Sequence, residues 1–147
     1  MKKYVGTKII EAKEMNLGDY NNYRGWKIPE NENPKKEGYM VKYPDGYESW
    51  SPKEIFEDAY RKYDESKLPA TSVLMQSNDY KGRFKAEYKQ LDIRYKGLEA
   101  MLKKWDAGEL NFTPTCPRNI YNIQIRAMEE YLTVLETRAI MEKIDLD

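Results

Sequence analysis

The chain has 147 residues and a mass of 17.5 kDa, enough for one domain or two small modules, and its 40% hydrophobic residues can form a core without disulfides. Histidine is absent and Cys116 is the one cysteine, so catalytic triads, His-ligated zinc sites, cysteine zinc clusters and intramolecular disulfides are excluded. The 25 basic and 25 acidic residues cancel, and we expect no field that would hold long nucleic acid.

The N-terminal third reads as short strands around one small helix. Residues 4–12 are rich in β-branched side chains and predict a strand, and residues 16–23 predict a short capped helix. Two apolar arms, 39–43 and 47–50, flank the sequence Pro-Asp-Gly, in which proline presets φ and glycine accepts a positive φ. These arms are expected to pair as a β-hairpin.

A helix is expected directly after the hairpin. Ser51 would cap it, with Pro52 at its first position and an acidic residue three positions after the cap. Its apolar stripe would consist of Ile55, Phe56, Ala59, Tyr60 and Tyr63. The pattern then lapses over residues 64–79, which we interpret as a connector between two modules.

The C-terminal half changes to a helical period. Seven residues follow heptad spacing and predict one long helix: Phe84, Tyr88, Leu91, Tyr95, Leu98, Leu102 and Trp105. This helix should end near residues 106–108. A turn follows at 111–117, where Thr115 or Cys116 would cap a second helix that runs from about 118 to about 144.

The second helix is more apolar than a two-helix seam requires. Its main seam is Ile125, Met128, Leu132, Leu135 and Ala139. Its further apolar residues are Ile120, Ile123, Tyr131, Val134, Ile140, Met141 and Ile144. Because one partner helix cannot cover both sets, we expect the hairpin to oligomerise, held by residues such as Leu132 and Leu135.

The expected fold class is therefore α+β, with a small antiparallel sheet and a short helix followed by a long antiparallel helical hairpin. The expected organisation is a small α+β module at 1–63, a connector at 64–79, and a hairpin domain for oligomerisation and ligand binding at 80–147.

Sequence motifs for chemistry are scarce. The eight glycines are scattered without a Rossmann or P-loop pattern, and no zinc-protease or calcium-loop spacing occurs. Acidic residues on the helices are interspersed with lysine and arginine, as on a solvated surface. We therefore expect no catalytic residues, no metal site and no cofactor, and a nucleotide, if one binds, must be held by side chains.

Three segments mix arginine with aromatic and amide side chains. In a nucleotide site, arginine and amides would hold the phosphate and ribose, and an aromatic ring would stack on the base. The three segments are the one with Arg24 and Trp26, the turn from Phe112 to Asn122 with Arg118, and the second helix with Arg126 and Arg138. The turn is favoured, since a helix N-terminus stabilises a nearby anion by ~0.3–1 kcal/mol. The plainer interpretation is that Arg118 is an exposed first-turn residue and that Phe112 closes the hairpin.

Arg126 and Arg138 are twelve residues apart, which is a little over three helical turns and places them about 18 Å apart along the axis. One pocket cannot easily use both from the same chain, so a ligand site built on them would be shared between subunits.

The sequence also resembles a family. The segments that carry the resemblance in the C-terminal half are FKAEYKQL (84–91), FTPTCP (112–117) and AMEEYLxxLxxRA (127–139). They look like the helical hairpin of phage proteins that sequester nucleotide signals of the bacterial defences CBASS and Thoeris. The segments YVGTK (4–8), YNxYRGW (20–26) and GYxSWSPK (46–53) are similar to a small phage module that precedes such a hairpin.

The two-part layout resembles the anti-Thoeris sponge more than its shorter, all-helical anti-CBASS relative. This resemblance implies a non-enzymatic oligomer, with dimers assembling into hexamers, that sequesters cyclic ADP-ribose isomers. In some members a second site takes cyclic di- or trinucleotides. Ligand contacts near the hairpin turn and between subunits are implied, and the candidate residues are Phe112, Arg118, Asn122, Arg126, Arg138, Tyr88, Arg24 and Trp26.

We therefore expect a phage sponge that binds a cyclic nucleotide signal without degrading it. From the mean hydropathy of −0.92, the lack of an apolar run of ~20 residues and the lack of a secretory signal we expect a cytoplasmic protein away from membranes. The resemblance implies that this is the cytoplasm of the infected bacterial host. The alternative is a phage structural or assembly protein whose hairpin only mediates oligomerisation. An enzyme that degrades such signals is disfavoured by the absence of histidine and of metal-binding spacing.

Overall fold

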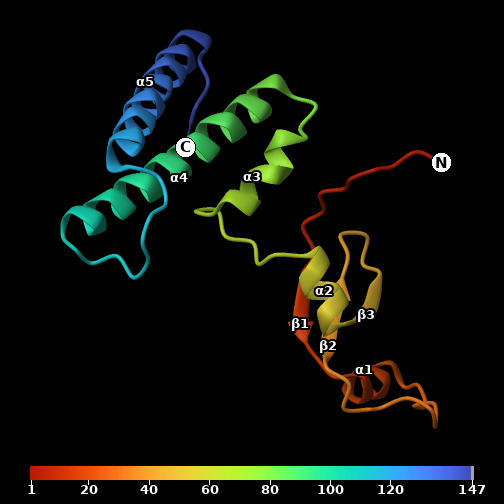
Figure 1. Ribbon diagram of the computed structural model, residues 1–147. Helices are drawn as coiled ribbons and strands as arrows, with labels where there is room; N and C mark the ends of the chain where they lie inside the picture. The colour runs from red at the N-terminus through yellow and green to blue at the C-terminus, as the bar shows by residue number, and fades with distance from the viewer. Residues whose placement is uncertain (147) are drawn as a thin grey trace. The chain divides into compact units, whose positions relative to one another are not determined.

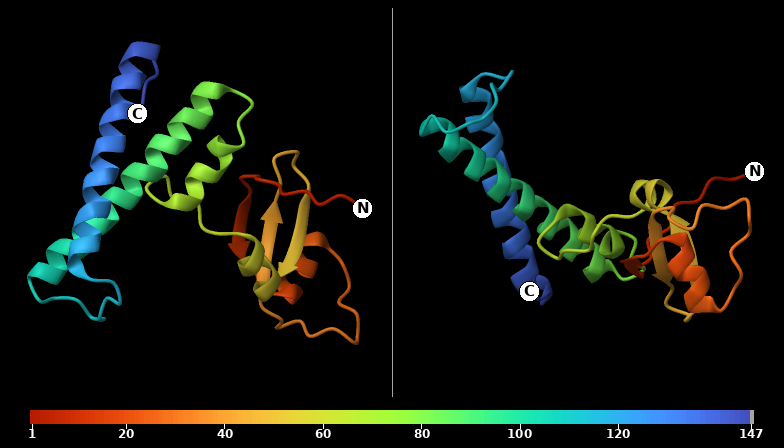
Figure 2. Two further views of the ribbon diagram at one scale, coloured as in Figure 1. Left: turned by 45° about the horizontal axis from the view of Figure 1, so that its top comes forward. Right: turned by 90° about the horizontal axis from the view of Figure 1, so that it is seen from below.

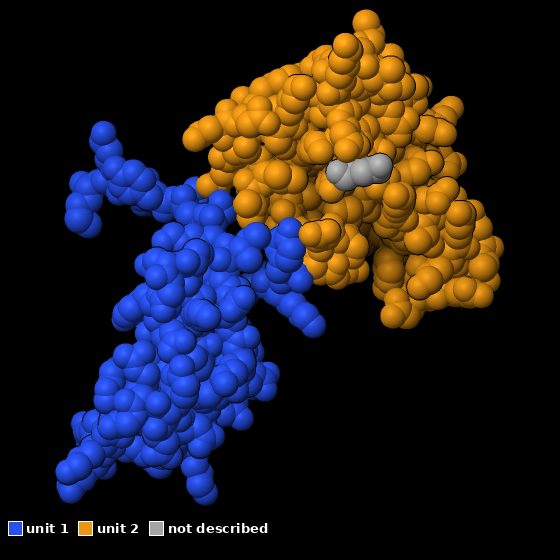
Figure 3. Space-filling view, turned by 180° about the vertical axis from the view of Figure 1, so that it is seen from behind, with its two compact units in different colours: residues 1–63 blue, residues 64–147 orange. Residues whose placement is uncertain are grey.

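The computed structural model describes residues 1–146. Contacts within the chain divide it into two compact units, Met1–Tyr63 and Asp64–Asp147, which are coloured separately in Figure 3. The first unit combines strands and helices and the second is helical (Figure 1), so the predicted α+β class is confirmed. None of the described helices is long and apolar enough to cross a membrane.

The first unit is built on a three-stranded antiparallel sheet with the order β1-β2-β3. The strands are β1 (Glu11–Glu14), β2 (Gly38–Lys42) and β3 (Glu48–Pro52). The β2–β3 pair is the predicted hairpin, with Met40 opposite Trp50. In its turn, Gly46 has a φ of 85°, a conformation that glycine adopts without steric cost.

Strand β1 is shorter than expected. Residues 1–10 contain no strand, so the prediction of a strand over 4–12 was wrong in its bounds. The reason lies in the partner, because Glu11 pairs with Lys42, the last residue of β2, and the chain then turns. Residues 4–10 have high β propensity but no stretch of β2 beside which to pair.

The two short helices of this unit differ in how they begin. α1 (Leu17–Arg24) has the predicted cap, since the Asn16 side chain accepts a 2.8 Å hydrogen bond from the Asp19 N–H. α2 (Lys53–Ala59) begins with Pro52 as N-cap and without a cap from any described side chain. The expected cap by Ser51 was wrong, because Ser51 belongs to β3 and its hydroxyl donates to the Pro52 carbonyl.

The two faces of the sheet are covered differently, with α2 against one side of the strands and α1 against the other (Figure 2). On the α2 side, the Tyr39 ring stacks on Phe56 at a centroid distance of 4.2 Å. The predicted stripe is covered only in part, because Ile55 is exposed on α2 and because Tyr60 and Tyr63 lie beyond Ala59, where the helix ends. On the other side, the Trp50 indole donates a 2.8 Å hydrogen bond to the Met15 carbonyl.

The second unit contains α3 (Leu68–Met75), α4 (Tyr80–Asp106) and α5 (Arg118–Glu142). The segment 64–79 had been expected as a connector, and the structure instead forms α3 there. α3 packs against α4 and buries Ala70 and Thr71. A helix of eight residues is too short to display a periodic apolar pattern, which explains why the sequence did not reveal it.

α4 and α5 form the predicted antiparallel hairpin. The Trp105 ring meets the Tyr121 ring at 5.6 Å beside the connecting loop, and towards the other end the Tyr88 hydroxyl donates a 3.1 Å hydrogen bond to Glu136. Late positions of α4 therefore contact early positions of α5, and earlier positions of α4 contact later positions of α5. The core of this unit contains Phe84, Leu135, Ala139 and Ile144, with Tyr88, Leu91 and Leu146 packed against it.

Burial along α5 corrects the expected interface. Leu135 is 0% exposed and Leu132 is also buried within the chain, so the prediction that these two leucines hold an oligomer together was wrong. Ile144 is likewise not on the outer surface. It follows Lys143, which ends the helix in the left-handed region at a φ of 53°, and it folds back into the core.

Five exposed apolar residues of α5 lie along one face of the helix, here called the outer stripe. They are 44 to 77% exposed and follow the helical repeat: Ile120, Ile123, Tyr131, Val134 and Met141. Ile140 is 81% exposed and lies on another face of the helix. At the start of α5, Pro117 is the N-cap and no described side chain caps the helix, so the expected cap by Thr115 or Cys116 was wrong.

Replacing Gly38 by alanine is expected to destabilise the first unit by about 1–3 kcal/mol, because the strand here has no room for a side chain. An added Cβ would lie 2.4 Å from the Ser51 carbonyl oxygen and 2.4 Å from the Trp50 ring. Chemical denaturation followed by tryptophan fluorescence measures the change. Gly6→Ala is the matched control, since no described atom lies within 4 Å of a Cβ there. Equal stability of the two variants would contradict the close approach.

Candidate functional site

The hairpin loop brings the last residue of α4 and the first residue of α5 together. Arg118 donates to both carboxylate oxygens of Asp106, through Nε at 3.2 Å and Nη2 at 3.0 Å. Its Nη1 donates to the amide oxygen of Asn122, one helical turn along α5. The guanidinium also lies 5.8 Å from the centre of the Trp105 ring. We call these four residues the turn-end cluster.

The turn-end cluster limits what Arg118 can offer a ligand. Its charge is paired with Asp106, whose side chain is 64% exposed, so an arriving phosphate would have to replace an existing bidentate partner. Asn122 uses its amide oxygen for Arg118 and keeps its NH₂ group as a donor. The expectation of a simply solvent-exposed Arg118 is therefore incomplete, because this side chain ties the two helices together.

Phe112 and Arg126 are the less committed candidates. Phe112 lies in the loop before α5 and is 53% exposed, so its ring is available for stacking. Arg126 is exposed, and its Nε donates to the Asn122 carbonyl of its own helix at 3.3 Å. Among the described residues, Arg126 forms no ion pair.

Arg138 lies towards the opposite end of the hairpin, in a cluster of its own. It donates to the Tyr80 hydroxyl at 2.6 Å and to a Glu142 carboxylate oxygen at 3.1 Å, and its guanidinium stacks 4.8 Å from the centre of the Phe84 ring. The Tyr80 hydroxyl donates to the other Glu142 oxygen at 2.6 Å. Arg138 therefore helps to join the start of α4 to the end of α5.

The pKa values at this end of the hairpin follow from these contacts. The hydrogen bond from Tyr80, reinforced by Arg138, lowers the pKa of Glu142, although desolvation acts in the opposite direction. The same contacts raise the pKa of Tyr80 and that of Arg138, in both cases chiefly through Glu142. The charged forms of Arg138 and Glu142 stabilise each other.

Tyr88 is a seam residue. Its ring packs against the core around Leu135, and its hydroxyl donates to Glu136. Packing between the two helices therefore explains the position of Tyr88. The other hairpin candidates lie at opposite ends of the hairpin, with Arg138 at one end and the rest towards the loop: Phe112, Arg118, Asn122 and Arg126.

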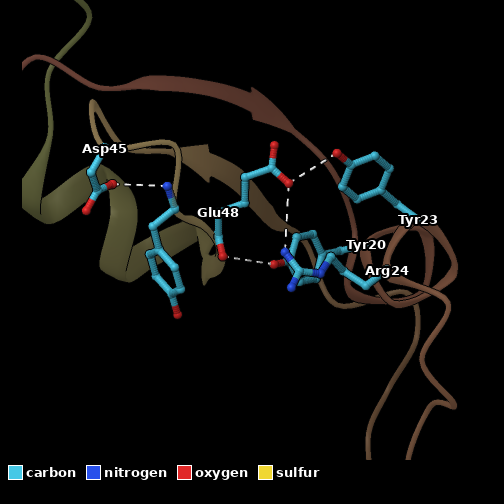
Figure 4. Close-up of polar contacts among 6 residues, drawn as sticks. Tyr20, Tyr23, Arg24, Asp45 and Glu48 are labelled. Atoms are coloured by element: carbon cyan, nitrogen blue, oxygen red, sulfur yellow. Dashed lines mark hydrogen bonds and ion pairs between the residues drawn. The ribbon is translucent and has the colours of Figure 1, made fainter.

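Arg24 and Trp26 lie in the first unit. Figure 4 shows Arg24 beside Tyr20, Tyr23 and Glu48. The Arg24 guanidinium is 4.7 Å from the centre of the Trp26 ring, and its Nη1 is 3.8 Å from a Glu48 carboxylate oxygen. The Tyr23 hydroxyl donates to the same oxygen at 3.1 Å, which raises the pKa of Tyr23. The Tyr20 hydroxyl donates to the Glu48 carbonyl at 3.4 Å. The predicted arginine–aromatic pair therefore exists, with its charge partly neutralised by Glu48.

A depression beside the β2–β3 turn was not among the sequence candidates. It has a volume of about 560 Å³ and is lined by Thr7, Lys8, Tyr43, Pro44, Asp45 and Tyr47. The available signal was the pair of tyrosines that flank the Pro-Asp-Gly turn, which sequence reasoning used for the hairpin alone.

Tyr80→Phe is expected to raise the pKa of Glu142 towards its ordinary value, because the phenol that donates to the carboxylate is lost. With a folded-state pKa below the unfolded value of ~4.3, Glu142 contributes stability above that pH and loses it as the pH falls through the folded-state pKa. The variant should lose less stability over this window. Carboxyl carbon NMR titration checks the pKa, with Tyr121→Phe as the control at the other end of the hairpin, and an unchanged Glu142 titration in Tyr80→Phe would contradict the assignment.

Comparison with known proteins gives one match. Residues 78–141, which span α4, the loop and nearly all of α5, match the family model described as Sequestin. Neither a curated protein nor a solved structure matches the chain. The match lies in the second unit, fits the sponge family that the sequence resembles, and indicates a sequestering function. The helical hairpin of this chain is therefore similar to the Sequestin family.

Proposed function

We propose that the hairpin unit binds a cyclic nucleotide immune signal and retains it without turnover, as a phage anti-defence sponge acting in the cytoplasm of the infected bacterium. The observation that supports this proposal is the family match over residues 78–141. Cyclic ADP-ribose isomers are the first ligands to test, and cyclic di- and trinucleotides the second.

The groups that such a ligand carries can be compared with the side chains at the end of the hairpin where the α4–α5 loop lies, here called the loop end. A cyclic ADP-ribose carries an adenine, two riboses and a pyrophosphate, so a tight site needs a stacking ring and charged donors. The exposed ring of Phe112 suits the adenine, and the guanidinium of Arg126 suits a phosphate. The Asn122 NH₂ group adds a neutral donor, and Arg118 takes part if the phosphate displaces Asp106.

The other candidate residues are less available to a ligand bound near the loop. Arg138 would have to exchange Glu142 for a ligand phosphate and would have to come from a second subunit to meet the loop end. Tyr88 is committed to the seam. Arg24 and Trp26 belong to the other unit and would form a separate contact.

Assembly of several copies is part of the proposal. The outer stripe leaves large apolar side chains of α5 in water, and its position along one helix face fits a second amphipathic helix. A second copy of the hairpin presents the same stripe, so a homodimer, or a hexamer built from dimers, would bury it twice. This interface replaces the one expected around Leu132 and Leu135.

A scaffold that only oligomerises is the second candidate function. The observation that favours it is that Arg118 and Arg138 are both engaged in ion pairs within the chain, while the outer stripe is exposed. Under this alternative the loop end binds no ligand, and Phe112 only closes the hairpin.

A release experiment separates these functions. The full chain is mixed with a cyclic ADP-ribose isomer, the free ligand is measured after filtration, and the protein is then denatured by heat. A sponge depletes the free ligand and returns it unchanged on denaturation, as judged by chromatography and mass. Ligand that is never depleted would support the scaffold, and a product of altered mass would support an enzyme.

Phe112→Ala is expected to weaken binding of the ligand that the chain retains by about 5- to 150-fold, which corresponds to the ~1–3 kcal/mol of one base stack. Arg126→Ala should also weaken binding, with a reduced dependence on salt because a phosphate contact is lost. Titration calorimetry measures both. Arg94→Ala is the matched control, an exposed arginine on α4. Unchanged affinity in both folded test variants would place the pocket elsewhere.

Val134→Glu is expected to dissociate the oligomer while the hairpin stays folded, because a charge in a buried interface costs several kcal/mol and one on a free surface costs little. Light scattering gives the mass and circular dichroism the helix content. Thr133→Glu adds the same charge to an exposed neighbour outside the outer stripe and should leave the mass unchanged. A 17.5 kDa monomer for the unmodified chain would overturn the assembly proposal.

A further inference from the structure

The depression beside the β2–β3 turn lies in the first unit, which the family match does not cover. Its volume of about 560 Å³ is within the range of small-molecule sites. One wall comes from the extended N-terminal segment, through Thr7 and Lys8. The other walls come from the hairpin turn and the two tyrosines that flank it.

A chain of aromatic contacts connects the two tyrosines of this depression to the packed rings between the sheet and α2. Along the α2 face of the sheet, Tyr39 stacks on Phe56 at 4.2 Å, and Phe56 stacks on Tyr60 at 4.9 Å. Tyr60 interacts with Tyr43 through their hydroxyls, and burial raises the pKa of Tyr60. Tyr43 in turn stacks with Tyr47 at 5.8 Å. The last ring is therefore held by packed neighbours although it faces water.

Tyr47 offers a flat surface that the fold does not use. Its side chain is 64% exposed, while its backbone is fixed by hydrogen bonds, since its N–H donates to Asp45 Oδ1 at 3.0 Å and its carbonyl accepts from the Tyr43 N–H at 2.8 Å. An exposed ring on a fixed backbone can stack on a planar ligand with little loss of conformational entropy.

Two opposite charges complete the lining. Among the described residues, no ion pair or hydrogen bond engages the Lys8 ammonium, so it remains available to an anion. Asp45 uses Oδ1 for the Tyr47 N–H and keeps Oδ2 as an acceptor for hydroxyl or amino groups. Figure 4 shows Asp45 at the turn, apart from the cluster around Glu48. The lining thus combines a stacking ring, an acceptor and a cation.

We propose that this depression is a binding site for a purine mononucleotide, with the base stacked on Tyr47, sugar hydroxyls donating to Asp45 and the phosphate paired with Lys8. This proposal does not depend on the ligand of the hairpin. It assigns a second, weaker nucleotide site to the first unit, open to solvent and suited to ligands that exchange rapidly.

The test uses the full chain with AMP and adenosine as probes, and saturation-transfer difference NMR to measure both dissociation constants. AMP is expected to bind more tightly than adenosine. Tyr47→Ala should weaken both probes at least about fivefold, which corresponds to 1 kcal/mol of stacking. Lys8→Ala should weaken AMP and leave adenosine unchanged, because adenosine has no phosphate. Tyr63→Ala is the matched control, another exposed tyrosine of the first unit, and should change neither constant.

Three results would overturn the proposal. They are no saturable binding of AMP, unchanged AMP affinity in Tyr47→Ala, and equal effects of Lys8→Ala on both probes. Phe112→Ala distinguishes this site from the hairpin site, since it should leave AMP binding intact. AMP binding that disappears in Phe112→Ala and persists in Tyr47→Ala would assign the nucleotide to the hairpin instead.

Discussion

The packing of α4 against α5 around Leu135 is the constraint on which the second unit depends. Two helices of 27 and 25 residues carry facing apolar stripes, and neither stripe can be removed from water without the other. Once Leu135 is enclosed by Phe84, Ala139 and Ile144, the register of the hairpin is set. That register places Arg118 beside Asp106 at one end and Arg138 beside Tyr80 and Glu142 at the other.

These polar clusters show a competition between holding the fold and holding a ligand. An arginine that pairs with a carboxylate of its own chain must exchange one anion for another before it can bind a phosphate, so part of the binding free energy is offset. Arg118 and Arg138 are in this position. An exposed ring such as Phe112 displaces little more than water when it stacks, which makes aromatic residues at the loop end the simpler source of affinity.

The first unit also exposes an aromatic ring on which a ligand can stack, but this ring lies beside the turn of a β-hairpin and not in a helical hairpin. Its sheet is small, and the aromatic residues of the α2 side extend past the buried part of the sheet to the exposed turn. The aromatic contacts that stabilise the unit therefore extend to an exposed ring on which a planar ligand can stack. The Gly38 backbone lies so close to the Trp50 indole that no Cβ fits between them, and the depression lies at the turn of the same hairpin.

Local patterns in the sequence determined the elements whose signals lie within a few residues. The heptad spacing from Phe84 to Trp105, the Pro-Asp-Gly turn and the Asn16 cap predicted α4, the β-hairpin and α1 because each depends on neighbours along the chain. The sequence also supplied candidate site residues, but it did not reveal which side chains they contact. Tertiary contacts alone decided the length of β1, which begins at Glu11 because β2 offers no partner to earlier residues, and the helix α3, which is too short to show a period. They also decided which arginines are paired, because Asp106 and Tyr80 lie far from Arg118 and Arg138 in sequence and meet them only when the hairpin closes.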